Sequence, residues 1–112
     1  MDIRKIDDRF SVTGQIGVVD IPAIATAGFK GIVCNRPDLE GFDQPPHMDL
    51  KDAAEKAGLS FAYIPVAPGA PLVHEPMQMA AFIEEVSGPV LGYCRSGARA
   101  ANLFAMALAA AA

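Results

Sequence analysis

The chain has 112 residues, 52% of them hydrophobic, and a formal net charge of −4 with no tryptophan. This length and composition predict one folded domain over residues 1–112, and they argue against a disordered chain or two domains. Nucleic-acid binding is not expected, because the sequence contains no basic block.

We expect neither a signal peptide at the first residues nor a membrane span in the last ones. The first residues have no apolar core of the kind that a signal peptide carries. The longest apolar stretch, Leu103–Ala112, is too short and too rich in alanine to span a bilayer. We therefore expect a cytoplasmic protein without a membrane partner, whose two cysteines are reduced.

Short β-branched runs alternate with helix signals in the first half of the chain. Residues 10–13 predict a strand, and residues 31–34 predict a buried one. Between them we expect a helix that ends near Gly28, with Asp20 as its N-cap and a proline in its first turn. A polar loop rich in Pro, Gly and Asp follows over residues 35–46.

The second half of the chain repeats this alternation of helices and strands. The predicted helices cover about 48–57, 76–86 and 98 onward, the predicted strands 61–64 and 89–93, and a proline-rich loop 65–74. The pattern indicates an α/β fold with a mostly parallel central sheet and helices on both faces. Because ligands bind at the carboxyl ends of such strands, the loops after Cys34, Ile64 and Tyr93 are expected to meet at one edge.

A cysteine ends the last predicted strand, and a short glycine-containing loop and a helix follow it. Backbone N–H groups and a helix N-terminus bind anions and favour the thiolate, so we predict Cys94 as a nucleophile and Arg99 as its anion-binding partner. Ser96 is expected to hydrogen-bond the sulfur. The predicted substrate-binding residues are Arg95, Ser96, Gly97 and Ala98 in this loop, with Arg36 and Asp38 after the neighbouring strand.

Other assignments stay open for some of these residues. In one alternative, Asp38 caps backbone N–H groups in a turn and Arg36 pairs with it. Cys34 is either an inert buried thiol, which we favour, or a resolving cysteine for Cys94. No metal site or cofactor is predicted, because the two histidines lack ligand spacing with the cysteines.

Several short motifs occur in the order and spacing of a known family. They are Thr13-Gly14-Gln15, Asn35-Arg36-Pro37-Asp38 with Glu40 and Gln44, Gly58-Leu59, Ile64-Pro65-Val66 and Cys94-Arg95-Ser96-Gly97-Ala98-Arg99. The chain thereby resembles the phosphatase-like domain of the beta-lactamase hydrolase-like protein family, over about residues 6–108.

The resemblance implies the fold of dual-specificity tyrosine phosphatases and cysteine chemistry on a small anion, either a phosphate ester or sulfane sulfur. Family members occur alone or fused to sulfide- or persulfide-oxidising enzymes, which implies a sulfur-oxidising partner. The residue before the cysteine is commonly His in the family and is Tyr93 here.

The length of the loop separates two chemistries. Cysteine phosphatases place five residues between Cys and Arg, whereas four lie between Cys94 and Arg99. The pattern Cys-Arg-x-Gly-x-Arg also resembles the rhodanese loop. A phosphatase needs a general acid as well, and no aspartate lies between Ile64 and Cys94.

We therefore expect a rhodanese-like sulfurtransferase that moves sulfane sulfur from thiosulfate or a persulfide. The alternatives are a phosphatase with a phosphocysteine intermediate, in which Asp38, Glu40, His74 or Glu75 supplies the acid, and a non-catalytic persulfide carrier or anion-binding regulatory domain.

Overall fold

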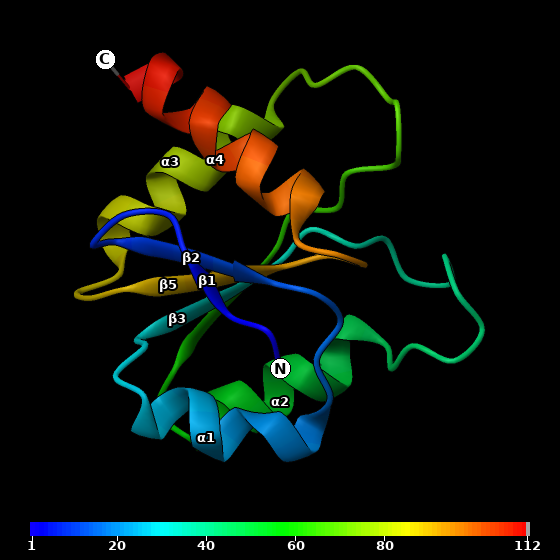
Figure 1. Cartoon of the computed structure of the whole chain (residues 1–112), viewed down its shortest axis with the longest axis vertical. Helices are drawn as coiled ribbons and strands as arrows, with labels where there is room; N and C mark the ends of the chain where they lie inside the picture. Colours follow the sequence, from blue (N-terminus) through cyan, green and yellow to red (C-terminus); the bar gives the residue numbers. More distant parts are fainter. Residues whose placement is uncertain (112) are drawn as a thin grey trace.

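A five-stranded sheet forms the centre of the computed structural model, which describes residues 1–111 (Figure 1). Its strand order is β1-β2-β5-β3-β4. The four longer strands are mutually parallel, and only β1 runs antiparallel, beside β2. The strands are β1 (Arg4–Lys5), β2 (Phe10–Thr13), β3 (Gly31–Cys34), β4 (Ser60–Tyr63) and β5 (Val90–Tyr93). The predicted mostly parallel sheet is thus confirmed.

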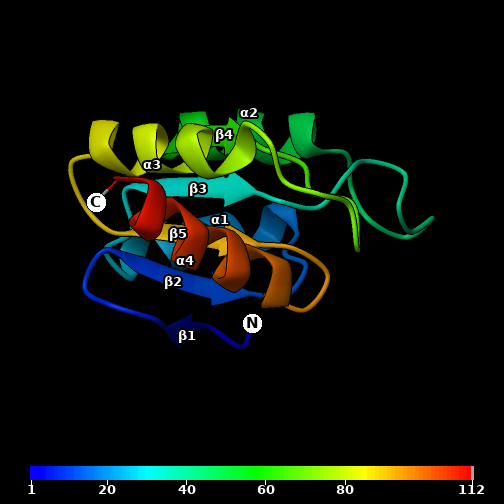
Figure 2. The same ribbon diagram turned by 90° about the horizontal axis from the view of Figure 1, so that it is seen from above.

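Helices cover both faces of the sheet (Figures 1 and 2). One face carries α1 (Ile21–Thr26) and α2 (His47–Lys56), and the other carries α3 (Glu75–Glu85) and α4 (Ala98–Ala111). The predicted α/β class with helices on both faces is confirmed. The last residue of the predicted C-terminal helix, Ala112, lies outside the described residues. Within residues 1–111, no helix has the length and apolar character needed to cross a membrane.

The core has two layers because neighbouring residues of a strand face opposite sides of the sheet. In β3, Ile32 and Cys34 pack toward α1 and α2, whereas Val33 packs toward α3 and α4. Phe10 joins the second layer, and its ring stacks on that of Phe104 with centroids 4.4 Å apart. Burying each large apolar side chain stabilises the fold by about 1.5–3 kcal/mol.

Two local features differ from the predictions. Strand β1 is only two exposed residues long and carries no apolar alternation, so no pattern predicted it. Asp20 occupies the N-cap position of α1, but its carboxylate accepts a hydrogen bond from the Gly17 N–H at 2.8 Å. This bond closes a preceding 3₁₀ turn, η1 (Val18–Asp20), so the side chain does not cap α1 itself.

The carboxyl ends of the parallel strands bring three loops together, as predicted. The Asn35 N–H donates to the Tyr93 carbonyl at 2.8 Å, and the Val66 N–H donates to the Asn35 carbonyl at 3.0 Å. These bonds extend the sheet beyond its strands. They hold the segments after β3, β4 and β5 side by side at the edge where the candidate site lies.

Candidate functional site

The loop after β5 wraps around the sulfur of Cys94. This side chain is fully buried, and its Sγ accepts a hydrogen bond from the Gly97 N–H at 3.1 Å. Gly97 adopts φ +94°, in the left-handed region that side chains disfavour. A Cβ there would lie 2.5 Å from an Arg4 nitrogen and 3.3 Å from the Thr13 carbonyl oxygen. Glycine is therefore required to turn this N–H toward the sulfur.

The segment after β2 supports the outer side of this loop. The Gln15 N–H donates to the Arg95 carbonyl at 3.4 Å. A Cβ on Gly14 would lie 2.9 Å from that same carbonyl oxygen, so glycine is needed for this close approach. Arg4 of β1 donates to the Ser96 carbonyl at 2.9 Å, a contact that the sequence did not suggest.

The loop leads directly into α4, whose N-terminus faces the sulfur. The Ser96 hydroxyl accepts a hydrogen bond from the Ala98 N–H at 3.3 Å, so it caps the start of the helix. We expected this hydroxyl to bond the sulfur, but the donor to the sulfur is Gly97. The partial positive charge at a helix N-terminus favours a thiolate or a bound anion at this position.

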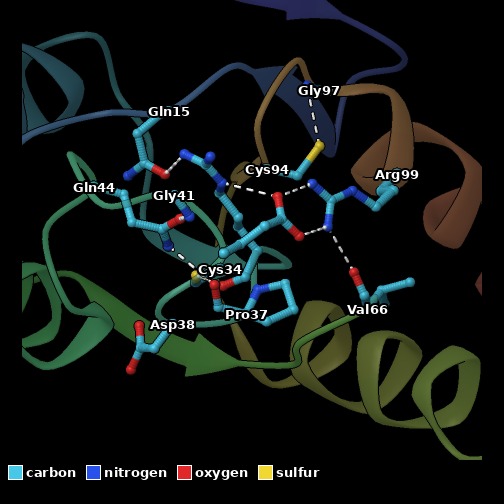
Figure 3. A network of polar contacts seen from close by, with 12 residues as sticks. Gln15, Cys34, Pro37, Asp38, Gly41, Gln44, Val66, Cys94, Gly97 and Arg99 are labelled. Atoms are coloured by element: carbon cyan, nitrogen blue, oxygen red, sulfur yellow. Dashed lines mark hydrogen bonds and ion pairs between the residues drawn. The ribbon is translucent and has the colours of Figure 1, made fainter. Parts of the chain in front are cut away.

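Arg99 projects from the first turn of α4 and is held by a carboxylate from the loop after β3. Its two terminal nitrogens donate to the two oxygens of Glu40 at 2.6 and 2.7 Å (Figure 3). One of them also donates to the Val66 carbonyl at 2.7 Å. These bonds to Glu40 raise the pKa of Arg99, and the nearby Cys94 sulfur contributes to the same shift.

Arg36 reaches the same carboxylate from the end of β3. Its Nε donates to Glu40 at 3.0 Å, and one terminal nitrogen donates to the Gln15 side-chain oxygen at 3.0 Å. Hydrogen bonds from Arg99, assisted by those from Arg36, lower the pKa of Glu40 below its ordinary value. The structure thus brings Arg36 and Arg99 together through Glu40, and Arg36 does not pair with Asp38.

Asp38 is turned away from this cluster (Figure 3). Its carboxylate accepts the backbone N–H of His47 at 2.9 Å and bonds the His47 ring at 2.7 Å. The same ring stacks on Tyr63 with centroids 3.6 Å apart. Asp38 thus accepts a backbone N–H, as in its alternative interpretation, but at the start of α2 and without Arg36 as its partner. Its contact with a substrate stays a prediction.

Cys34 and Tyr93 lie on the opposite face of the sheet from Cys94. Both side chains pack in the layer beneath α1 and α2, whereas Cys94 packs in the other layer. Burial raises the pKa of the Cys34 thiol, which donates to the Arg36 carbonyl at 3.2 Å. Burial also raises the pKa of Tyr93. This arrangement favours the inert-thiol interpretation of Cys34 over a disulfide with Cys94.

The remaining candidate acids lie at the start of α3. The Glu75 carboxylate accepts the Val73 N–H at 2.8 Å, and this bond lowers the pKa of Glu75. His74 precedes it and is exposed. Among residues 1–111, no cluster of three His, Cys, Asp or Glu side chains has an arrangement suited to a metal ion.

A polar hollow of about 500 Å³ opens beside the loop. Its walls include Gln15, Arg36, the exposed Phe42 and the exposed Arg95. Arg95 thus lies at the edge of the site rather than within it. Two arginines, Arg36 and Arg95, and two carboxylates, Glu40 and Asp43, border the hollow. The sequence-based prediction paired neither Arg36 nor Arg99 with Glu40.

The model of the family described as "Beta-lactamase hydrolase-like protein, phosphatase-like domain" matches residues 2–111. The chain belongs to this family. A beta-lactamase hydrolase-like protein of Agrobacterium fabrum is 35% identical over 109 residues, which are 95% of this chain and 25% of that protein. A homologue from Xylella fastidiosa is 34% identical over the same coverage. The chain thus spans about a quarter of the length of these curated relatives.

Solved structures share this fold. A Neisseria meningitidis protein described as a "putative phosphatase" superposes with a TM-score of 0.84 and 35% identity, over 93% of this chain and 74% of the other. A variant of P. aeruginosa TpbA in complex with pTyr has a TM-score of 0.62 at 12% identity, over 85% of this chain and 54% of the other. The predicted cysteine-phosphatase fold of this phosphatase-like domain is confirmed.

Proposed function

We propose that this domain is a sulfurtransferase in which Cys94 carries sulfane sulfur as a persulfide. The observation that supports the proposal is that Glu40, the carboxylate bound to Arg99, is held in its ionised form. Two arginines hold it and lower its pKa, so it is a poor proton donor near neutral pH. A phosphatase must protonate its leaving alkoxide, whereas sulfite and thiolates leave without a proton.

The other acids offer little help to a phosphatase. Asp38 is engaged by His47, and Glu75 is bound to a backbone N–H with a lowered pKa. His74 is exposed at the start of α3. A reaction that needs no general acid therefore fits these side chains better than one that does.

Sulfur transfer proceeds in two displacements. The Cys94 thiolate attacks the outer sulfur of the donor, and the donor leaves with the electrons of the broken bond as sulfite or a thiolate. The Gly97 N–H and the α4 N-terminus stabilise negative charge on the sulfur. An acceptor thiolate then attacks the terminal sulfur, which restores the Cys94 thiolate.

The arginines and the loop backbone would hold the donor anion. Arg99 lies close to the sulfur, and Arg36 and Arg95 border the adjoining hollow. Backbone groups of Ser96 and Ala98 complete the loop. The phosphatase arginine position, one residue later, is Ala100, which is fully buried in the core. Arg99 is therefore the arginine on which this shorter loop closes.

Phosphate-ester hydrolysis is the second candidate, and the solved structures favour it. The Neisseria protein is described as a phosphatase, although as a putative one, and the TpbA variant was crystallised with pTyr. In that reaction Cys94 would form a phosphocysteine, with Arg99 binding the phosphoryl oxygens. Both candidates use a small anionic substrate, and a sulfur-oxidising partner enzyme stays a prediction of the family resemblance.

A paired steady-state assay distinguishes the candidates. Wild type and Cys94→Ser are compared for sulfur transfer from thiosulfate to cyanide, and for phosphate release from phenyl phosphate, whose phenoxide leaving group needs a proton. We expect transfer that is lost in the variant, with negligible phosphate release. Phosphate release that depends on Cys94, without sulfur transfer, would refute the proposal. The absence of both activities would refute it in favour of the carrier or regulatory interpretation.

A further inference from the structure

One negative charge lies between the two buried or half-buried arginines of the site. The side chains of Arg36, Arg99 and Glu40 are only 8%, 18% and 19% exposed. The carboxylate is bonded to both guanidinium groups. The three side chains together carry a single net positive charge, where the arginines alone would carry two.

The loop around Glu40 is built to hold the carboxylate in this place. The Gln44 side chain accepts the Gly41 N–H at 2.7 Å and donates to the Pro37 carbonyl at 3.0 Å, which closes the turn. The preceding residue, Leu39, is 95% exposed and adopts φ +66°. A left-handed backbone is unfavourable for leucine, so the turn presents Glu40 at an energetic cost.

We propose that Glu40 tunes which anion the Cys94 loop accepts, by lowering its preference for doubly charged over singly charged anions below what the two arginines alone would give. A persulfide anion carries one charge, whereas phosphate monoesters, sulfate and thiosulfate carry close to two near neutral pH. Each charge on the ligand is repelled by Glu40, so a dianion loses twice as much binding free energy as a monoanion.

Removing the charge of Glu40 should therefore strengthen the binding of a dianion more than that of a monoanion. With water-like screening at a separation of about 6 Å, removing the Glu40 charge strengthens binding of a monoanion about threefold and of a dianion about tenfold. The ratio of the two affinities therefore rises about threefold. If Glu40 served only to position Arg99, its removal would weaken both anions, the dianion more, and the ratio would fall rather than rise.

The inference rests on the proposed function only in taking the Cys94 loop as the anion site, so its test uses equilibrium binding. Sulfate and methanesulfonate, a dianion and a monoanion of similar shape, are titrated against the protein and followed by NMR. The variants are Glu40→Gln, which removes the charge, Glu40→Asp, which keeps it, and Asp52→Asn, which removes an exposed charge from α2, away from the hollow. Sulfur transfer is not measured, so a failure of the proposed reaction does not affect the result.

We expect the sulfate-to-methanesulfonate affinity ratio to rise about threefold in Glu40→Gln and to change little in the other two variants. An unchanged ratio, an equal rise in Asp52→Asn, or the absence of anion binding at the loop would overturn the inference. If Glu40→Gln does not fold, Arg36→Gln provides the reciprocal test. It removes a positive charge from the same three side chains and is expected to lower the ratio about threefold.

Discussion

Gly97 tests the link between the loop backbone and the sulfur. Replacement by alanine places a side chain on a residue with φ +94°, which costs about 1–2 kcal/mol. The new Cβ also crowds the Thr13 carbonyl and displaces Arg4, whose hydrogen bond to Ser96 contributes about 0.5–1 kcal/mol. The total loss of unfolding free energy is therefore about 1.5–3 kcal/mol.

Gly28→Ala is the matched control. Gly28 adopts φ +100°, but an added Cβ would meet nothing within 4 Å. It carries the conformational cost alone, about 1–2 kcal/mol. In a chain of 112 residues each kcal/mol lowers Tm by about 4 °C. We expect Tm losses of about 6–12 °C for Gly97→Ala and about 4–8 °C for Gly28→Ala.

The two variants should also differ in activity. Gly97→Ala misaligns the N–H that bonds the Cys94 sulfur, so kcat/KM for sulfur transfer is expected to fall about 10–100-fold. Gly28→Ala should retain the wild-type value. Differential scanning calorimetry and the thiosulfate assay measure both effects. Equal Tm losses together with unchanged transfer in Gly97→Ala would refute the reasoning.

Three further predictions concern the side chains of the site. Arg99→Lys keeps the positive charge but loses the paired hydrogen bonds to Glu40, so kcat/KM for sulfur transfer should fall about 10–100-fold, with little change in the free energy of unfolding. Full activity of this variant in the steady-state assay would contradict the prediction. Cys34→Ser should keep sulfur transfer, because this thiol lies on the other face of the sheet, and a loss of turnover would show that it participates. Because the pKa of Glu40 is lowered in the folded state, its ionised carboxylate stabilises the fold at pH values above the ordinary Glu pKa, and this stabilisation is lost as the pH falls through the folded-state pKa. Denaturant titrations should therefore show that the unfolding free energy falls more steeply with decreasing pH in wild type than in Glu40→Gln. Parallel curves for the two proteins would contradict this.

The strands and the Cys94 loop were predictable because their signals are local. The short β-branched runs mark β2 and β3, and the loop from Cys94 to Arg99 is continuous in sequence. Because a helix N-terminus favours a thiolate, a reactive cysteine can be predicted at this place without knowledge of the rest of the fold. The alternation of side chains along a strand could also have predicted that Tyr93 and Cys94 face opposite sides of the sheet.

The partners of the arginines were not predictable in this way. Glu40 and Arg99 are 59 positions apart in the chain, and their pairing depends on how the loop after β3 folds over the sheet edge. Several carboxylates in that loop had equivalent claims from sequence alone. The structure separates them, because Asp38 bonds His47 and Glu40 bonds the arginines.

The most direct test of the central claim is the mass of the protein after brief treatment with thiosulfate. The account predicts an increase by one sulfur atom, mapped to the peptide that contains Cys94, removed by a thiol acceptor and absent in Cys94→Ser. An unchanged mass with thiosulfate, together with a phosphoryl group on Cys94 after treatment with p-nitrophenyl phosphate, would contradict it.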